Sequence, residues 1–172
     1  MLVQESFKFG TLSSMPADAL EEMLAVIKTH VHEDAGMHEL LFKSKFILTE
    51  LLTNAIKHAN TSQVSLNLEI TDALVKFVKT DYGNPFMLPQ IKDEQFKDAL
   101  IITADVMHTL YAKQKEELTY FYCHENEAPS INLDNDLPEH FGLLIITKAA
   151  DEFFYHFDEQ NRANTFTATI NL

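Results

Sequence analysis

The stretch FILTELLTNAIKHA, from Phe46 to Ala59, decides the fold of this chain. At about 100° per residue, an α-helix brings Glu50, Asn54 and Lys57 into one narrow stripe, with His58 beside them. A carboxylate, an amide and an ammonium group are thus aligned along one side of a helix. The other side carries the apolar residues Leu48, Leu51, Leu52, Ala55 and Ile56. The pattern predicts a helix that packs on a core and presents polar groups to a pocket, although this segment alone also fits an ordinary solvated helix face.

Two further motifs follow along the chain. Asp81 and Gly83 lie in the sequence DYGNPF, directly after a predicted strand at 73–80. Gly142 and Leu143 lie in the sequence HFGLL, where a second amphipathic segment begins. A polar helix, an Asp-x-Gly-x-Pro turn and a Gly-Leu helix start therefore occur in this order.

With these three motifs the chain resembles the Bergerat-fold ATPase superfamily of gyrase, heat-shock chaperone, histidine kinase and mismatch-repair proteins. The layout is closest to that of the bacterial anti-sigma-factor serine kinases, which have a short N-terminal strand, two helices, the three boxes and a terminal hairpin. The resemblance covers nearly the whole chain except residues 87–139. It implies a histidine-kinase-like ATPase fold with ATP and Mg²⁺ as ligands.

Hydrophobic periodicity predicts the secondary structure around these motifs. Strands are expected at 2–10, 63–71, 73–80, 118–124, 153–158 and 165–172, and helices at 16–34, 38–60 and 93–111. They predict an α/β (α+β) two-layer sandwich, in which helices cover one face of a mostly antiparallel sheet. Residues 1–172 are expected to form a single domain, with an insert or elaborated lid at about 87–139.

The resemblance assigns a role to each residue of the first box. Asn54 would bind the phosphate-bound Mg²⁺ through its amide oxygen. Glu50 would be the catalytic base, which accepts the proton of an attacking water or serine hydroxyl. Lys57 would reach a phosphate as a point charge, and His58 would belong to the same nucleotide-binding box.

The second box would recognise the base. The resemblance implies that Asp81 accepts a hydrogen bond from the exocyclic amine of adenine. A carboxylate there would reject guanine, which offers a carbonyl instead. Gly83 would let the backbone approach the base, and Thr165 on the last strand would reach the adenine through water. A strand-ending turn without a ligand and a surface threonine are the simpler alternatives.

The third box departs from the family pattern. Relatives have Gly-x-Gly-Leu, whose glycines let phosphate oxygens approach backbone N–H groups at a helix start. This chain has His140 in place of the first glycine and keeps Gly142 and Leu143 as the binding positions, and residues 84–141 contain no glycine. The segment 87–139 is therefore either a lid that closes over ATP or a partner-binding module on a fold that binds phosphate less tightly.

Composition narrows the possible functions. The chain has 172 residues and a net charge of −13, which disfavours direct binding to nucleic acid or anionic lipid. No basic N-terminal start and no long apolar run are present, so we expect a cytoplasmic protein. Cys123 is the only cysteine, which excludes an internal disulfide and a cysteine-based metal cage. His30 and His32 diverge by about 200° on a helix, so helix-dipole contacts are favoured over a metal site.

Two functions of different classes fit these observations. The first is an ATP-binding regulatory domain resembling an anti-sigma-factor serine/threonine kinase. By that likeness it would form a homodimer, hold a sigma factor and phosphorylate a small antagonist protein. The second is a non-catalytic partner-binding protein with a degenerate nucleotide site. A detached catalytic domain of a histidine kinase fits less well, because the chain carries no dimerisation helix pair with a phospho-acceptor histidine.

Overall fold

The computed structural model describes residues 2–10, 16–31, 36–58, 61, 63–87, 99–126 and 140–172. The helices are α1 (Ala17–His30), α2 (Met37–His58) and α3 (Phe141–Ala149). The strands are β1 (Val3–Phe9), β2 (Val64–Ile70), β3 (Leu74–Asp81), β4 (Ala99–Ala104), β5 (His108–Lys115), β6 (Leu118–Glu125), β7 (Glu152–Asp158) and β8 (Ala163–Asn171). In the described part of the chain, no helix combines the length and the apolar character that a membrane crossing requires.

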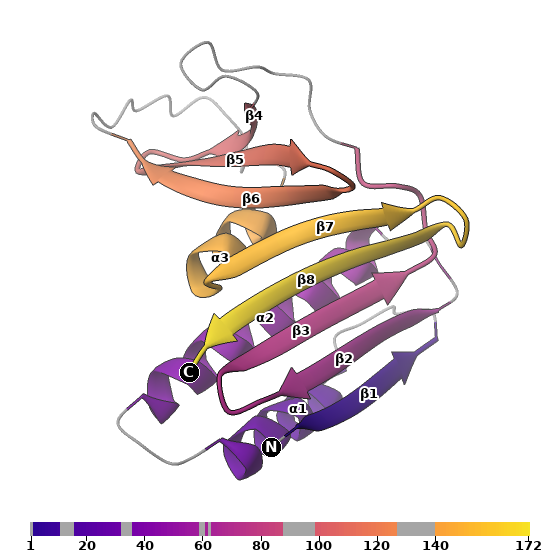
Figure 1. Cartoon of the computed structure of the whole chain (residues 1–172), viewed down its shortest axis with the longest axis vertical. Helices are drawn as coiled ribbons and strands as arrows, with labels where there is room; N and C mark the ends of the chain where they lie inside the picture. The colour runs from indigo at the N-terminus through magenta and orange to yellow at the C-terminus, as the bar shows by residue number, and fades with distance from the viewer. Residues whose placement is uncertain are drawn as a thin grey trace.

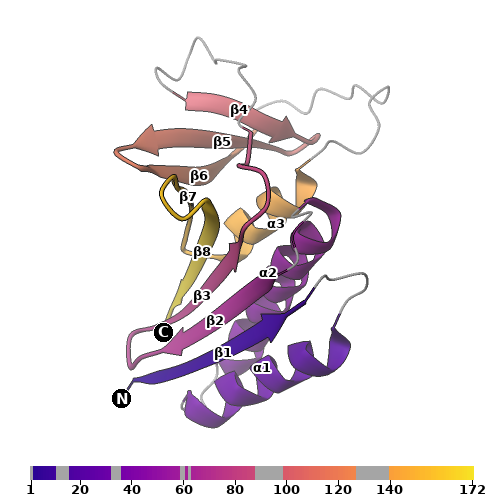
Figure 2. The same ribbon diagram turned by 90° about the vertical axis from the view of Figure 1, so that its right-hand side faces the viewer.

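The strands form one eight-stranded sheet in the order β1-β2-β3-β8-β7-β6-β5-β4 (Figure 1). Each neighbouring pair is antiparallel. The three helices lie on one face of this sheet (Figure 2). The α+β two-layer fold predicted from the sequence is therefore confirmed.

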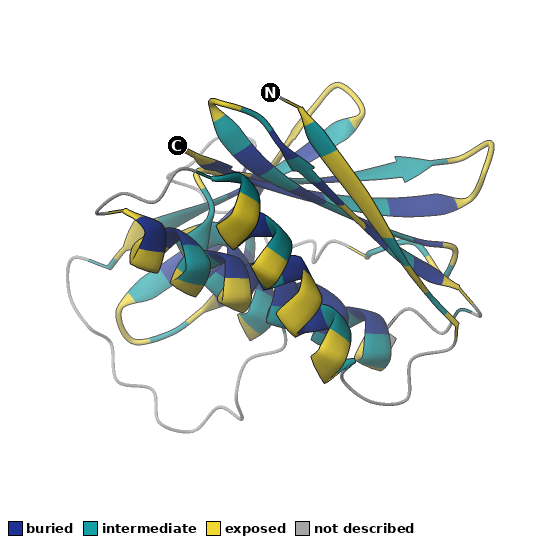
Figure 3. Ribbon diagram, turned by 90° about the horizontal axis from the view of Figure 1, so that it is seen from below, coloured by how far each residue is buried: buried dark blue, intermediate teal, exposed yellow. Residues whose placement is uncertain are grey.

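The core lies between the helices and the covered face of the sheet. Strand β3 alternates strictly, so that Val75, Phe77, Lys79 and Asp81 are buried. On α2 the predicted apolar stripe is buried as well, because the helix turns that side toward the sheet (Figure 3). The buried positions on that stripe are Leu48, Leu51, Leu52 and Ala55. The end of β3, where Asp81 lies, is thus placed under the helix that carries Glu50 and Asn54.

The first helix is shorter than predicted. It ends at His30, and Val31 after it has extended backbone angles. Gly36 directly precedes α2, and its carbonyl accepts a hydrogen bond from the Leu40 N–H at 2.9 Å. The other predicted helix at 38–60 agrees with α2, and the strand predicted at 118–124 agrees with β6.

The helix predicted at 93–111 is wrong where the structure describes it. Residues 99–115 form the hairpin β4–β5, and residues 93–98 lie outside the described part. The hairpin turns because Asp105 Oδ1 accepts hydrogen bonds from the N–H groups of Met107 (2.7 Å) and His108 (2.6 Å). An aspartate that binds the backbone ahead of it competes with helix formation. The helical spacing of apolar residues in this segment was coincidental.

Candidate functional site

Two helices meet at the first and third boxes, where α2 passes the start of α3. If a Cβ is built on Gly142, it lies 2.5 Å from Glu50 Oε2 and 3.3 Å from Asn54 Oδ1. Any larger residue would have to displace the polar groups of α2. Gly142 therefore leaves the Glu50 carboxylate and the Asn54 amide in place, and the structure brings the predicted residues Glu50, Asn54 and Gly142 together.

Glu50 lies in a half-buried position that changes the pKa of its carboxyl group. Desolvation by burial raises the pKa of its carboxyl group, and the positive charge of Lys57 opposes part of that rise. Lys57 itself is exposed, one helical turn beyond Asn54. A carboxylate with a raised pKa is a better proton acceptor than an ordinary glutamate, so this end of the site has the groups that general base chemistry needs.

Asp81 ends β3 as a buried acid. The residue is 2% exposed, and its Oδ2 forms an ion pair with the ammonium group of Lys79. Its Oδ1 accepts hydrogen bonds from the Gly83 N–H at 2.9 Å and from Asn164 Nδ2 at 3.0 Å. The aspartate and glycine of the second box are thus hydrogen-bonded to each other within a larger network.

Asn164 connects the second box to the last two strands. Besides Asp81, its Nδ2 contacts the carbonyl oxygens of Gly83 (3.3 Å) and Asn84 (3.1 Å). Its Oδ1 accepts a hydrogen bond from the Tyr155 hydroxyl at 2.7 Å. These bonds fix the turn after β3 against β7 and β8, so the position of Asp81 is determined before any ligand binds.

An aromatic cluster extends this network toward α3. The Phe86 N–H donates to the Tyr155 hydroxyl at 3.0 Å, and the Phe86 ring makes edge contacts with its neighbours. The ring centroids lie 5.4 Å away for His140, 5.6 Å for Tyr155, 5.8 Å for Phe166 and 6.2 Å for Phe121. Phe86 therefore joins the second box to the start of the third.

His140 is the residue immediately before α3, and its backbone is left-handed, with φ 73° and ψ 15°. Glycine adopts this conformation readily, whereas other residues are strained by their Cβ. His140 therefore adopts a backbone conformation that suits glycine, at the position where the resemblance predicts the first glycine of the third box. The His140 carbonyl accepts a hydrogen bond from the Leu143 N–H at 2.9 Å, which closes the first turn of the helix.

Three of the predicted site residues are not among the side chains gathered at the site, or have side chains that the structure does not describe. Leu143 is buried in the hydrophobic core, and the side chain of His58 lies outside the described part. Thr165 pairs with Thr80, so it points to the sheet face opposite Asp81, while Asn164 pairs with Asp81.

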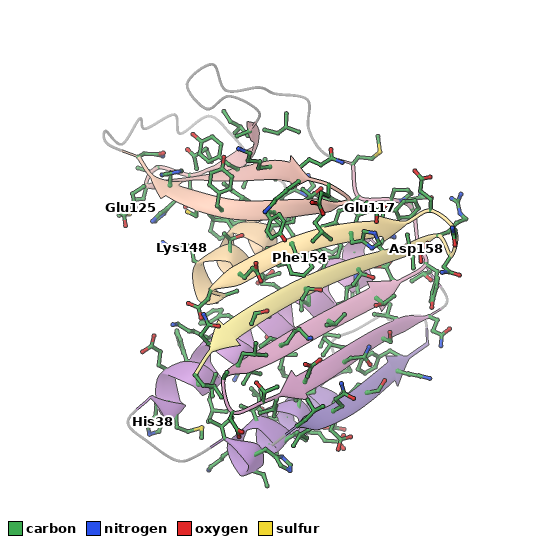
Figure 4. All side chains as sticks on the ribbon, in the orientation of Figure 1. His38, Glu117, Glu125, Lys148, Phe154 and Asp158 are labelled. Carbon is green, nitrogen blue, oxygen red and sulfur yellow. The ribbon has the colours of Figure 1, made fainter. Side chains whose placement is uncertain are left out.

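Thr165 instead lines a shallow pocket of about 410 Å³ on the sheet face that the helices leave uncovered. Glu117 and Phe154 line the same pocket, and both are visible on that face in Figure 4. The strand register therefore does not support the prediction that Thr165 reaches the adenine through water, and it places Asn164 beside Asp81.

Lys79, Asn164, Tyr155 and Phe86 were not found from the sequence. Period-two alternation in β3 was a usable signal for Lys79, because it follows Val75 and Phe77 on the buried face. Asn164 and Tyr155 are recognisable only once the strand register is known. Among the described residues, no group of three or more His, Cys, Asp or Glu side chains is placed to hold a metal ion.

Comparison with known proteins gives the family. The model of the histidine kinase-like ATPase domain matches residues 12–170, which include α2, β3, α3 and most of β8. No curated protein matches the chain. Because the match covers most of the sequence and includes the residues gathered at the site, the chain belongs to the histidine kinase-like ATPase domain family.

Proposed function

We propose that this ATPase domain is a protein serine/threonine kinase of the anti-sigma-factor type, which binds ATP between α2, the end of β3 and the start of α3. The observation that carries the proposal is that Glu50 and Asn54 lie beside Gly142, where an added Cβ would come within 2.5 Å of Glu50 Oε2 and 3.3 Å of Asn54 Oδ1. A proton acceptor, an amide oxygen and a helix start whose N–H groups can donate to phosphate oxygens are then close together.

In the proposed reaction, a serine hydroxyl oxygen of a small antagonist protein attacks the γ-phosphorus of ATP. A new O–P bond forms, and the bond between the γ-phosphorus and the β–γ bridging oxygen breaks. ADP leaves with that electron pair, and Glu50 accepts the hydroxyl proton. The raised pKa of Glu50 supports this role, because it strengthens the carboxylate as a base.

The residues present also fit a magnesium ion held by the nucleotide. Mg²⁺ prefers oxygen ligands and commonly uses one or two protein groups together with phosphates and water. Asn54 supplies a neutral amide oxygen beside the glycine at the start of α3. When bound there, the ion would neutralise phosphate charge, while Asn54 holds the triphosphate against Gly142.

The regulatory part of the proposal is a homodimer that holds a sigma factor and releases it according to the phosphorylation state of the antagonist. It rests on the order of the three boxes and on the compact arrangement of the helices around them. The segment 87–139, of which residues 99–126 form β4, β5 and β6, would serve as a lid or as part of the partner surface.

The alternative is a protein that binds partners without phosphoryl transfer. His140 favours it, since a side chain stands where the family pattern has a glycine. Glu50→Gln separates the two functions. A kinase variant of this kind should bind ATP with nearly the parent affinity and lose phosphoryl transfer by about a hundredfold or more. The measurement is transfer of labelled γ-phosphate to antagonist proteins, with calorimetry of ATP binding beside it. Absence of transfer by the parent would leave only the partner-binding function, and equal transfer by the parent and the variant would remove Glu50 as the base.

A further inference from the structure

Lys79 is a buried lysine beneath the second box. It is 3% exposed and lies on the covered face of β3, between Phe77 and Asp81. Lysine is almost never fully buried unless it is paired. Desolvation lowers the pKa of its ammonium group, and the charge and hydrogen bond of Asp81 oppose that effect.

Two contacts fix the position of the ammonium group. It forms the ion pair with Asp81 Oδ2, and it lies 5.0 Å from the ring centroid of Phe166. Phe166 is the register partner of Lys79 on β8, just as Asn164 is the partner of Asp81. The cation therefore sits between a carboxylate and an aromatic face, two groups that both favour positive charge.

The hydrogen bonds to Asp81 limit what else it can accept. An ionised carboxylate has about four acceptor positions, two on each oxygen. Gly83 and Asn164 both donate to Oδ1, and Lys79 donates to Oδ2. Among the described residues, this leaves one acceptor position, on Oδ2, the oxygen that Lys79 holds.

We propose that Lys79 is a positioning residue that determines base selectivity, because its ammonium group is the counter-charge of the Asp81 carboxylate and holds Oδ2 so that the remaining acceptor position faces the exocyclic amine of adenine. This inference rests on the proposed ATP binding. Without the ammonium group, Asp81 would be a buried carboxylate with no counter-charge, and Oδ2 would lose the group that orients it. Inosine triphosphate has no exocyclic amine at this position, so its binding does not depend on that acceptor.

The test compares ATP with inosine triphosphate, which carries a carbonyl in place of the amine. In the parent protein, ATP should bind more tightly than inosine triphosphate. In Lys79→Met, ATP affinity should fall by about ten- to a hundredfold, with little loss for inosine triphosphate, so the preference disappears or reverses. Lys79→Gln, which keeps a donor without the charge, should show the same loss of preference and serves if Lys79→Met does not fold.

Lys76→Met is the matched control. Lys76 lies on the same strand and is ion-paired with Glu69 at 2.7 Å, but on the uncovered face of the sheet. That variant should keep the parent ratio of affinities, and Lys79→Arg, which keeps the positive charge, should preserve the preference for ATP.

The outcomes distinguish a failure of the Lys79 inference from a failure of the proposed ATP binding. If the parent binds ATP and Lys79→Met lowers the affinity for both nucleotides by the same factor, or for neither, Lys79 has only a structural role and this inference is wrong. If the parent binds neither nucleotide, the proposed function fails and this inference fails with it. The ion pair itself is checked without ligand, because Lys79→Met and Asp81→Asn together should lower the melting temperature less than the sum of the two single changes.

Discussion

The two ends of the candidate site are built on different physical principles. At the α2–α3 end, Glu50 is half-buried, and Asn54 lies close to Gly142 because glycine has no side chain. At the β3–β8 end, Asp81 and Asn164 are buried, and both belong to one hydrogen-bond network. A change at the first end should therefore alter activity with little effect on folding, and a change at the second should alter folding first.

Asp81→Ala should have the largest effect on stability. It leaves the Lys79 ammonium group buried without its counter-charge and removes the acceptor for Gly83 and Asn164. Breaking one partner of a buried pair costs about 3–5 kcal/mol in the free energy of unfolding. Urea denaturation measures it, with Glu69→Ala as the control, where loss of the more exposed pair with Lys76 should cost no more than about 1 kcal/mol. If both variants lost the same free energy of unfolding, the buried network around Asp81 would be no more important for stability than an exposed ion pair.

Gly142→Ala should show the opposite behaviour. The added Cβ would meet Glu50 Oε2, the far end of a flexible side chain, so the carboxylate moves and the helix remains. Alanine also favours a helix by up to about 1 kcal/mol over glycine. We expect the melting temperature to stay near that of the parent while phosphoryl transfer falls by about tenfold or more, since misplacement by 1 Å can cost about a hundredfold. Gly10→Ala is the control, because no atom lies within 4 Å of its added Cβ.

His140→Gly should relieve strain and tighten ATP binding. A non-glycine residue in the left-handed region costs about 1 kcal/mol, although the edge contact of His140 with Phe86 would be lost. Glu116→Gly is the matched control, since Glu116 also has a positive φ of 56° but lies at the β5–β6 turn. Both variants should gain similar stability, and only the first should bind ATP more tightly. Weaker binding by His140→Gly, most visible at low pH, would make the imidazolium a phosphate ligand instead.

Lys57→Met should shift the pH dependence of phosphoryl transfer by a small amount. The positive charge of Lys57 lowers the pKa of Glu50, so its removal raises that pKa further above the ordinary glutamate value. A base must be ionised, and activity is lost as the pH falls through its pKa. The acid side of the pH–rate profile should thus move to higher pH. Lys57→Arg keeps the charge and should leave the profile in place.

The same contrast explains what could be predicted from the sequence. α2 was predictable because its polar and apolar residues follow a helical period over 22 residues, and β2 and β3 because they alternate strictly. Glu50, Asn54 and Gly142 were candidates because each belongs to a recognisable motif. Their contact could not be derived from spacing, since it depends on how α2 and α3 pack.

The buried end of the site was harder to predict for a physical reason. On a strand, neighbouring residues point to opposite faces, so the register decides which side chain of β8 lies beside Asp81. That register pairs Asn164 with Asp81, and it could not be derived from the sequence. The counter-charge of Lys79 comes from a residue two positions along the same strand, and its burial depends on the helices above. The β4–β5 hairpin was missed because its apolar spacing fits a helix. The turn is stabilised instead by a hydrogen bond that the Asp105 side chain accepts from the backbone.

Titration of the purified parent protein with ATP, with and without magnesium, tests the central claim most directly. The arrangement of Asn54, Gly142 and Asp81 predicts saturable binding of one ATP per chain that weakens when magnesium is removed. Asn54→Ala should lose that magnesium dependence, because its amide oxygen is the expected ligand. Binding that is absent at millimolar ATP, or that is unchanged by magnesium and by Asn54→Ala, would contradict the account.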